Sequence, residues 1–258
     1  MPGDLAKRAL DGSRFADVRW VDSTGSTNAD LLALARSGAS EGVVLVADHQ
    51  TAGRGRQGRA WTAPPGASLL LSILLRPAAA AAQTTTMAVA VAAAEAVHEL
   101  AGFQPRLKWP NDLVWPGDGS ALDRKLAGIL AEADWAAVDN VAVVVGIGIN
   151  VVWPDELPDE LAEIAVAINH IAHVQIDREQ LLIALLRRLD RWLYAPELVA
   201  RWRELSATLG RRVRILLPAG NLTGTAVDVD ERGHLVVETA NGERRTVAVG
   251  DVVHVRTQ

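Results

Sequence analysis

The sequence predicts an α+β protein with a small β barrel at its carboxyl end. Two buried strand patterns, VVLVADHQ from Val43 and SLLLSILL from Ser68, predict the centre of a sheet. An Ala-rich run over residues 84–100 and an amphipathic run over 178–194 predict helices. After Gly210 the pattern changes to short β runs separated by Ala-Gly-Asn, Glu-Arg-Gly and Asn-Gly turns. We therefore expect one domain over residues 1–209 and a five-stranded barrel over residues 210–258.

The other elements follow from periodicity and turn chemistry. Thr27 is the expected N-cap of a helix over residues 28–37 that stops at Gly38, and Asp177 is the expected N-cap of the helix over 178–194. Gly102 closes the Ala-rich helix, and Pro196 starts a further helix that ends near residue 209. Further strands are expected at residues 17–22, around 107 and 113, and at 126–133 and 141–149. The expected loops are residues 51–66, the Ala run 78–82 and the acidic stretch 152–168, the last a candidate lid.

Composition excludes several functional classes. With 258 residues, of which 49% are hydrophobic and 22% charged, the chain can bury a full core. The net charge of -5 argues against broad nucleic-acid binding, because phosphate neutralisation needs a surplus of Lys and Arg. The absence of Cys excludes disulfides, thiolate catalysis and Cys-ligated zinc. The amino end lacks the apolar segment of a signal peptide and no later run resembles a membrane span, so we expect a soluble, cytoplasmic protein.

The lysines are few and unevenly placed. Only three of the 26 basic residues are lysines, namely Lys7, Lys108 and Lys125. A chain that uses Arg almost everywhere, yet keeps Lys at two interior positions, points to sites that need a compact ammonium group. Compositional drift with chance survivors is the alternative.

A Gly- and Arg-rich loop follows the first buried strand pattern. Its GRGRQG segment, residues 53–58, matches the dinucleotide-binding pattern GxGxxG, but Trp61 and two prolines follow it where a Rossmann fold requires a helix. Its Arg54, Arg56 and Arg59 can fold over a polyphosphate, because Gly permits close backbone approach and Arg supplies charge-assisted hydrogen bonds. Arg76 lies behind the turn. The alternative is a solvated basic loop.

Two further segments combine charge with turn chemistry. KWPND, residues 108–112, is expected to form a type I turn with Pro110 in second position, and it brings a cation, an aromatic ring and two polar groups to a sheet edge. In RKLAGIL, Lys125 stands at the mouth of a buried strand and Gly128 permits a ligand to approach the backbone. Lys125 can hold a carboxylate and a phosphate together, or it can extend its stem along apolar surface to reach water. GIGIN, residues 146–150, ends the next strand.

In this order and spacing, the motifs resemble the biotin protein ligase family. The likeness runs from about Val21 to the end and is carried by STN at 26–28, Gln50, GRGRQGRAW, KWPNDL, KLAGILAE, GIGIN and the terminal barrel. The resemblance implies a mixed sheet with helices related to class II tRNA synthetases and an SH3-like barrel. It also implies formation of biotinoyl-5'-AMP from biotin and Mg-ATP, then transfer of biotin to a lysine of the biotin carboxyl carrier protein domain of a carboxylase. From the residues alone, the inference stops at activation of a carboxylate with a nucleotide.

The resemblance also implies roles for individual residues. The expected catalytic residues are Lys125, Arg54 and Arg56. The expected biotin-binding residues are Ser26, Thr27, Asn28, Gln50, Gly53, Arg54, Gly55, Arg56, Lys125 and Gly128. The expected ATP-binding residues are Arg56, Arg59, Trp61, Lys108, Asn111, Asp112, Lys125 and Asn150. The ligands of Mg²⁺ and the base of the transfer step are not identified, and none of the six His is a convincing base.

Two departures from the family pattern and two alternative functions complete the predictions. The stretch between KWPND and KLAGIL is longer and more acidic than the usual hairpin, and only about 25 residues precede STN, too few for the helix-turn-helix domain of a DNA-binding repressor. We expect residues 53–61 and 154–163 to be mobile without ligand and to become ordered over the acyl adenylate. The alternatives are a lipoate or octanoate transferase and a carrier- or RNA-binding adaptor without catalysis. The oligomeric state is not predicted.

Overall fold

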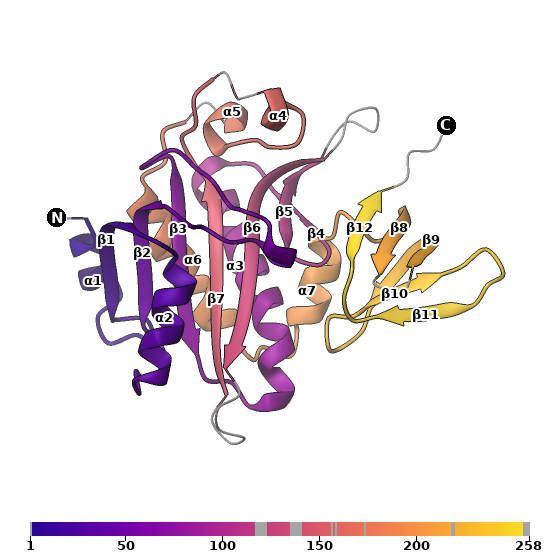
Figure 1. The fold of residues 1–258 in the computed structure, drawn as a ribbon, viewed down its shortest axis with the longest axis horizontal. Helices are drawn as coiled ribbons and strands as arrows, with labels where there is room; N and C mark the ends of the chain where they lie inside the picture. Colours follow the sequence, from indigo (N-terminus) through magenta and orange to yellow (C-terminus); the bar gives the residue numbers. More distant parts are fainter. Residues whose placement is uncertain are drawn as a thin grey trace.

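We analyse the chain as a computed structural model that describes residues 2–116, 123–134, 141–155, 157, 159–172, 174–217 and 220–254. In these residues a seven-stranded mixed sheet with helices lies beside a five-stranded antiparallel sheet near the carboxyl end (Figure 1). The predicted α+β fold is therefore confirmed. Most of the long acidic stretch between KWPND and KLAGIL, residues 117–122, lies outside the described residues.

The large sheet has the strand order β1-β2-β3-β7-β6-β5-β4. Strands β1 and β2 are parallel, and every other neighbouring pair is antiparallel. The strands are β1 (Val18–Thr24), β2 (Val44–Gln50), β3 (Ser68–Leu75), β4 (Arg106–Lys108), β5 (Asp112–Trp115), β6 (Arg124–Asp134) and β7 (Ala142–Asn150).

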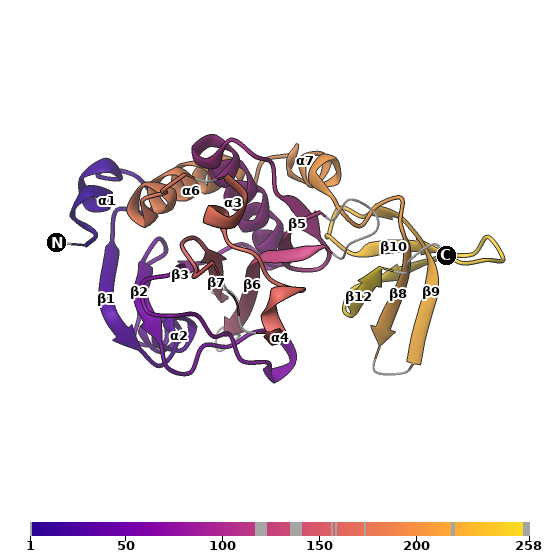
Figure 2. The same cartoon turned by 90° about the horizontal axis from the view of Figure 1, so that it is seen from above.

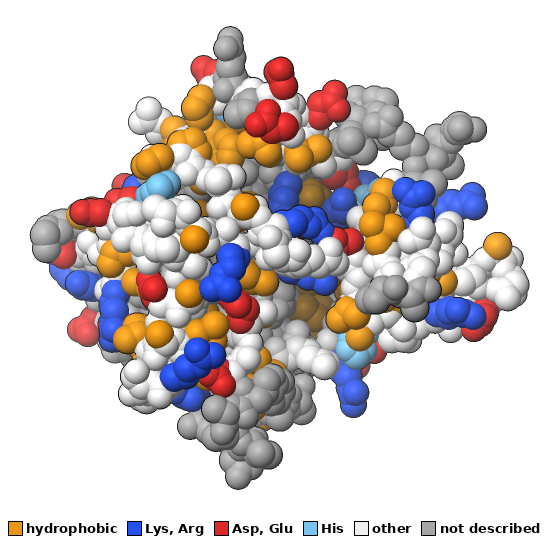
Figure 3. Space-filling view, in the orientation of Figure 1, with side chains coloured by type: hydrophobic (Ala, Val, Ile, Leu, Met, Phe, Trp, Pro, Cys, Tyr) orange, Lys and Arg blue, Asp and Glu red, His pale blue; other side chains and the backbone are white. Residues whose placement is uncertain are grey.

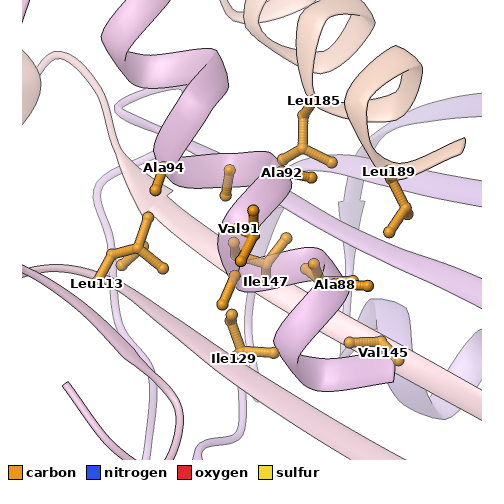
Figure 4. Close-up of a cluster of buried hydrophobic side chains, with 14 of the residues drawn as sticks. Ala88, Val91, Ala92, Ala94, Leu113, Ile129, Val145, Ile147, Leu185 and Leu189 are labelled. Atoms are coloured by element: carbon orange, nitrogen blue, oxygen red, sulfur yellow. The ribbon is translucent and has the colours of Figure 1, made fainter. Parts of the chain in front are cut away.

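Helices cover both faces of this sheet unequally (Figure 2). Helix α3 lies between the sheet and helix α6, where small side chains such as Ala88 and Ala92 let Leu185 and Leu189 of α6 pack closely (Figure 4). In the part of the chain that is described, no helix is both long and apolar enough to cross a lipid bilayer. The helices are α1 (Asp4–Ala9), α2 (Thr27–Arg36), α3 (Thr85–Ala101), α4 (Asp159–Ala162), α5 (Ile168–Ala172), α6 (Arg178–Trp192) and α7 (Leu198–Leu205), with 3₁₀ turns at Arg56–Gly58 and Ala79–Thr84.

The C-terminal sheet has the strand order β11-β10-β9-β8-β12, all antiparallel. Its apolar side chains, Val213 and Val237 among them, belong to the same buried cluster as the core of the large sheet. Its strands are β8 (Arg212–Leu217), β9 (Gly220–Val229), β10 (Leu235–Glu238), β11 (Arg244–Val247) and β12 (Asp251–His254).

Predicted helix ends are confirmed where one capping residue determines them. Asp177 caps α6 by accepting hydrogen bonds from the N–H groups of Glu179 and Gln180, and Gly102 ends α3 in the left-handed conformation. The N-cap prediction for Thr27 is wrong: Ser26 is the N-cap, because the Thr27 hydroxyl lies against Gln50 instead.

Other predictions are wrong where distant contacts decide. The Ala run predicted as a loop contains a 3₁₀ turn, and the stretch 152–168 contains α4. The helix after Pro196 is shorter than predicted and spans Leu198–Leu205. The predicted turn in KWPND is present at residues 109–111, and a cis peptide bond joins Trp109 to Pro110 within it.

Candidate active site

The cavity arises from the side-chain alternation of β7. Val143, Val145, Ile147 and Ile149 point to the helix α3 side and are buried there. On the opposite face, Ala142 and Val144 pack in the cluster that includes Leu31 of helix α2. The next residues on that face are Gly146 and Gly148, which have no side chains, and they line a cavity of about 560 Å³.

Glycines and one aromatic ring form the floor of the cavity. Gly128 of β6 and Gly148 of β7 are paired across the ladder. The indole of Trp61 lies so close that a Cβ built on Gly148 would stand 2.6 Å from its Nε1, and one on Gly128 would stand 2.8 Å from its Cζ3. The Nε1 atom is buried and has no hydrogen-bond partner among the described residues. Trp61 therefore lies inside the cavity, with its ring packed on these two glycines.

The amino end of α2 supplies a polar wall. Three residues are buried there, namely Ser26, Thr27 and Asn28. Gln50, the last residue of β2, lies opposite them in the cavity lining. The Oε1 atom of Gln50 accepts a hydrogen bond from the Thr27 N–H at 2.8 Å and lies 3.0 Å from the Thr27 hydroxyl. Ser72 of β3, which is fully buried, lies behind this wall. The wall thus offers neutral donors and acceptors at one end of the cavity.

The Arg loop forms the opposite side of the cavity, where it meets the C-terminal sheet. Arg56 donates to Asn111 Oδ1 at 3.2 Å and to the carbonyl of Gly250 at 3.4 Å. Arg59 forms an ion pair with Asp251 of β12, and the Arg56 guanidinium lies 3.7 Å from the same carboxylate. In Figure 3, basic side chains gather where the two sheets meet.

Burial changes the pKa of one arginine in this loop. It lowers the pKa of the Arg56 guanidinium, the charge of Asp112 opposes this shift, and the charge of Arg59 adds to it. Arg56 stays protonated at neutral pH, because the intrinsic pKa of Arg is above about 12. A partly desolvated guanidinium of this kind binds an anion more strongly than an exposed one does.

Lys125 stands at the start of β6 between these two sides. Its Nζ lies 2.7 Å from Asp112 Oδ1, and 5.3 Å from the centroid of the Trp61 ring, over which it makes a cation–π contact. The contact with Asp112 has the distance of an ion pair, but its angles fall outside hydrogen-bond geometry, since Oδ1 has no hydrogen-bond partner among the described residues. The ammonium group of Lys125 is therefore held in the cavity by a carboxylate and a ring.

Trp109 of KWPND serves the attachment of the C-terminal sheet. Its backbone N–H donates to Thr208 Oγ1 at 3.0 Å, and its indole Nε1 donates to the carbonyl of Gly233 at 3.0 Å. The side chain is 3% exposed. The turn that carries Asn111 and Asp112 is thus fixed to the C-terminal sheet.

Fourteen of the sixteen predicted site residues line this one cavity. Gly53 does not line it: a Cβ there would stand 2.4 Å from the Trp61 carbonyl oxygen, so Gly53 lets the loop fold back on itself. Asn150 is 3% exposed, and its amide donates to the carbonyl of Val166. Arg76, noted with the loop arginines, donates to the carbonyls of Ala35 and Ala39 and also lies outside the cavity.

The sequence analysis missed several residues that line the cavity. From the C-terminal sheet these are Leu216, Asp251, Val252 and Val253. No local pattern marks them, because they reach the cavity through the docking of one sheet on another. Two others, Gly146 and Gly148, lie within the GIGIN motif, and their period-2 spacing was a usable signal.

The candidate lid has its own small apolar cluster. Trp153 and Ala167 are buried there with Ala67, and Leu157 and Leu161 pack against them. The backbone of Lys125 is bridged to Ala165 of the same stretch. The expectation that residues 154–163 are mobile assumed little apolar area, and these contacts argue against that assumption for the residues described there.

Comparison with known proteins agrees with this geometry. Residues 20–150 match the biotin/lipoate A/B protein ligase family, and residues 208–255 match the biotin protein ligase C terminal domain. The chain belongs to the biotin/lipoate A/B protein ligase family. A relative in this family, the biotin--[acetyl-CoA-carboxylase] ligase of Mycobacterium tuberculosis, is 40% identical over 95% of this chain and 91% of its own length.

Other members of the ligase family give the same result. The bifunctional ligase/repressor BirA of Bacillus subtilis is 34% identical over 95% of this chain and 78% of its own length. The solved structure of the biotin protein ligase from Aquifex aeolicus in complex with biotin and ATP has a TM-score of 0.77 and 28% identity, and the match covers 94% of this chain and all of that one. The resemblance to biotin protein ligases inferred from the motifs is thereby confirmed.

Proposed function

We propose that the chain is an ATP-dependent biotin protein ligase that makes biotinoyl-5'-AMP and then biotinylates a lysine of a biotin carboxyl carrier protein domain. The observation that carries this function is the convergence of STN, the Arg loop, KWPND and KLAGIL on one cavity, although up to a hundred residues separate them. The cavity has a neutral polar end, an apolar floor and a cationic side. These three parts match a ureido ring, a valeryl chain and a nucleotide phosphate.

In the first step a carboxylate oxygen of biotin attacks the α-phosphorus of ATP and pyrophosphate leaves. Two anions must approach each other, so the main requirements are positioning and charge neutralisation. Lys125 contacts both the carboxylate and the α-phosphate, and Arg54 and Arg56 cover the phosphates. Trp61, at the floor of the cavity, supports the adenine. In the second step the lysine amine of the carrier attacks the acyl carbon and AMP leaves.

Magnesium accompanies the nucleotide in this proposal and neutralises phosphate charge when bound. Mg²⁺ binds through one or two carboxylates together with substrate phosphates and water. Asp112 fits such a role, because it brings a carboxylate into the cavity, where its Oδ1 pairs with the Lys125 ammonium at 2.7 Å and would exchange that cation for Mg²⁺. Asn111, which lines the same cavity, is the second candidate ligand.

The neutral polar wall favours biotin over lipoate or octanoate. Thr27 and Gln50 have further hydrogen-bonding capacity that a ureido ring can use, whereas an aliphatic chain would remove water from these groups and offer no partner, at a cost of about 1–3 kcal/mol per group. The test is ATP/pyrophosphate exchange by the full chain with biotin, lipoate or octanoate as the acid. We expect exchange with biotin alone. Exchange with lipoate or octanoate instead would support the alternative enzyme, and no exchange with any acid would support a non-catalytic adaptor.

Two coarser expectations belong with this proposal. We place the boundary between the catalytic domain and the C-terminal sheet at residues 209/210, just before β8. We also place the enzyme in the cytoplasm. Labelling of a carrier domain inside cells, as opposed to one directed outside, tests the location.

A further inference from the structure

A chain of hydrogen-bonding groups runs behind the polar wall from Glu132 to Gln50. Asn28 Nδ2 donates to Glu132 Oε2 at 2.8 Å and to the carbonyl of Leu130 at 3.2 Å. Ser72 Oγ lies 2.6 Å from Asn28 Oδ1 and 2.7 Å from Thr27 Oγ1. Asn28 and Ser72 are 4% and 0% exposed, so their hydrogen-bond partners must come from the protein.

Counting protons shows that this chain lacks one hydrogen. Three contacts between oxygens need a proton, namely Ser72 to Asn28, Ser72 to Thr27, and Thr27 to Gln50. The two hydroxyl groups supply only two protons. Asn28 Oδ1 and Gln50 Oε1 supply none.

The orientation of Asn28 decides which hydroxyl donates to which oxygen. Since its Oδ1 is a buried acceptor, Ser72 donates to it, and Thr27 then donates to Ser72. This leaves Thr27 Oγ1 and Gln50 Oε1, 3.0 Å apart, without a proton between them. Gln50 Oε1 keeps the hydrogen bond from the Thr27 N–H at 2.8 Å, so the unfavourable feature is the contact between the two oxygens, which needs an N–H donor from a ligand to relieve it.

Reversal of the Asn28 amide would remove this need. With Nδ2 toward Ser72, Asn28 would donate to Ser72, Ser72 to Thr27, and Thr27 to Gln50, and every acceptor would be satisfied internally. The two groups on the other side of Asn28, the Glu132 carboxylate and the Leu130 carbonyl, are both acceptors and prevent this orientation.

We propose that Glu132 is a positioning residue that sets the hydrogen-bond direction of the polar wall, so that the wall accepts from a ureido N–H of biotin. The inference rests on the proposed function. Glu132 does not line the cavity; it acts through Asn28 and Ser72. Its carboxylate thereby makes the cavity selective for an acid whose ring carries N–H donors.

Glu132 also contacts Arg54, so the test must distinguish the effect of this ion pair from the effect of the hydrogen bond to Asn28. Its Oε1 lies 4.0 Å from Arg54 of the Arg loop, with which it forms a loose ion pair. Glu132→Met removes both the acceptor and the charge at equal side-chain length. Glu132→Gln removes only the charge, because its amide oxygen can still accept from Asn28. Ser72→Ala interrupts the proton chain without altering Glu132.

The experiment measures calorimetric Kd values of the full chain for biotin and for its cyclic carbamate analogues, in which oxygen replaces either ureido N–H. In the unaltered chain one analogue should bind at least about 100-fold more weakly than biotin, since a donor has become an acceptor. Glu132→Met and Ser72→Ala should reduce this discrimination to about 10-fold or less, and Glu132→Gln should keep it within about 3-fold of the unaltered chain.

Two results would overturn the inference while leaving the enzyme intact. One is full discrimination by Glu132→Met. The other is equal loss in Glu132→Gln and Glu132→Met, which would assign Glu132 to the charge of Arg54 instead. Failure of the unaltered chain to bind biotin would overturn the proposed function and this inference with it.

Discussion

Gly128 and Gly148 face each other across the β6–β7 ladder, and together they form the surface on which the Trp61 indole lies. A methyl group at Gly148 would stand 2.6 Å from the ring, closer than any ordinary contact. Because the ring lies at the floor of the cavity, adding a side chain there changes the site without disturbing the opposite, helix-covered face.

We expect Gly148→Ala to displace Trp61 and to weaken biotin binding by about 10- to 100-fold, as overpacking costs about 1–3 kcal/mol. Intrinsic Trp fluorescence should report the displaced ring, and calorimetry the affinity. Gly25→Ala is the control, because no atom lies within 4 Å of a Cβ placed there. Equal affinity of the two variants would show that the floor tolerates a side chain and that Trp61 is mispositioned.

Lys125 provides the second test. Lys125→Ala should slow ATP/pyrophosphate exchange by about 100- to 1000-fold, the effect of removing one oriented charge from a preorganised site. Lys125→Arg should also be impaired, because a Cβ on Gly128 would stand only 2.9 Å from the Lys125 Cε, which leaves little room for a guanidinium. Lys7→Ala, in exposed helix α1, is the control and should be unaffected. Near-normal exchange by Lys125→Ala would remove this residue from the mechanism.

The Arg loop should respond to Asp251. The carboxylate pairs with Arg59 and lies near Arg56, in the place where a phosphate would compete. In amide hydrogen exchange of the ligand-free chain, Asp251→Asn should therefore reduce protection of residues 53–61. Biotin and ATP should raise protection in both forms. Asp228→Asn, which breaks the ion pair with Arg203 elsewhere, is the control. Protection that is the same with and without ligand would identify the loop as a rigid scaffold.

Acid should weaken the attachment of the C-terminal sheet through Asp123. Burial by itself raises the pKa of this carboxyl, but the hydrogen bond from His254 and the charge of Arg211 outweigh burial and lower the pKa from 3.8 to about 2. Because the folded value lies below the unfolded one, Asp123 stabilises the fold above about pH 4, and this contribution is lost as the pH falls toward 2.

The contribution at neutral pH is about 2 kcal/mol of unfolding free energy. Asp123→Asn should lose it at pH 7 and show a flatter stability profile between pH 4 and pH 2, measured by urea denaturation. Exposed Asp11 supplies the control, Asp11→Asn. A profile for Asp123→Asn that falls with acid as steeply as that of the unaltered chain would contradict the assignment.

The sequence was informative wherever function depends on one short segment. Strand β3 has the predicted bounds, because a continuous apolar run between turn residues permits few alternatives. The Arg loop, KWPND and Lys125 were found from charge and glycine content, and they do converge on one cavity. The family resemblance added the substrate, which residue chemistry alone did not specify.

What the sequence did not reveal depends on packing between distant segments. Asp251 reaches the cavity only because one sheet docks on another, and Trp109, expected in a nucleotide-binding motif, fixes that docking. Glu132 stands within KLAGILAE, but its partner Asn28 is 104 residues away. Asn150 ends a predicted motif, yet the pleat turns its amide toward Val166 and away from the cavity.

The anchoring of the KWPND turn on the C-terminal sheet has a thermodynamic consequence. The Trp109 ring joins the two sheets through its bond to Gly233, and a single apolar cluster continues from one sheet into the other. Neither sheet can melt without exposing that shared apolar surface, so we expect the chain to unfold in one cooperative transition and to give one calorimetric peak. A substitution that loosens either sheet should then lower the temperature at which the whole enzyme is inactivated.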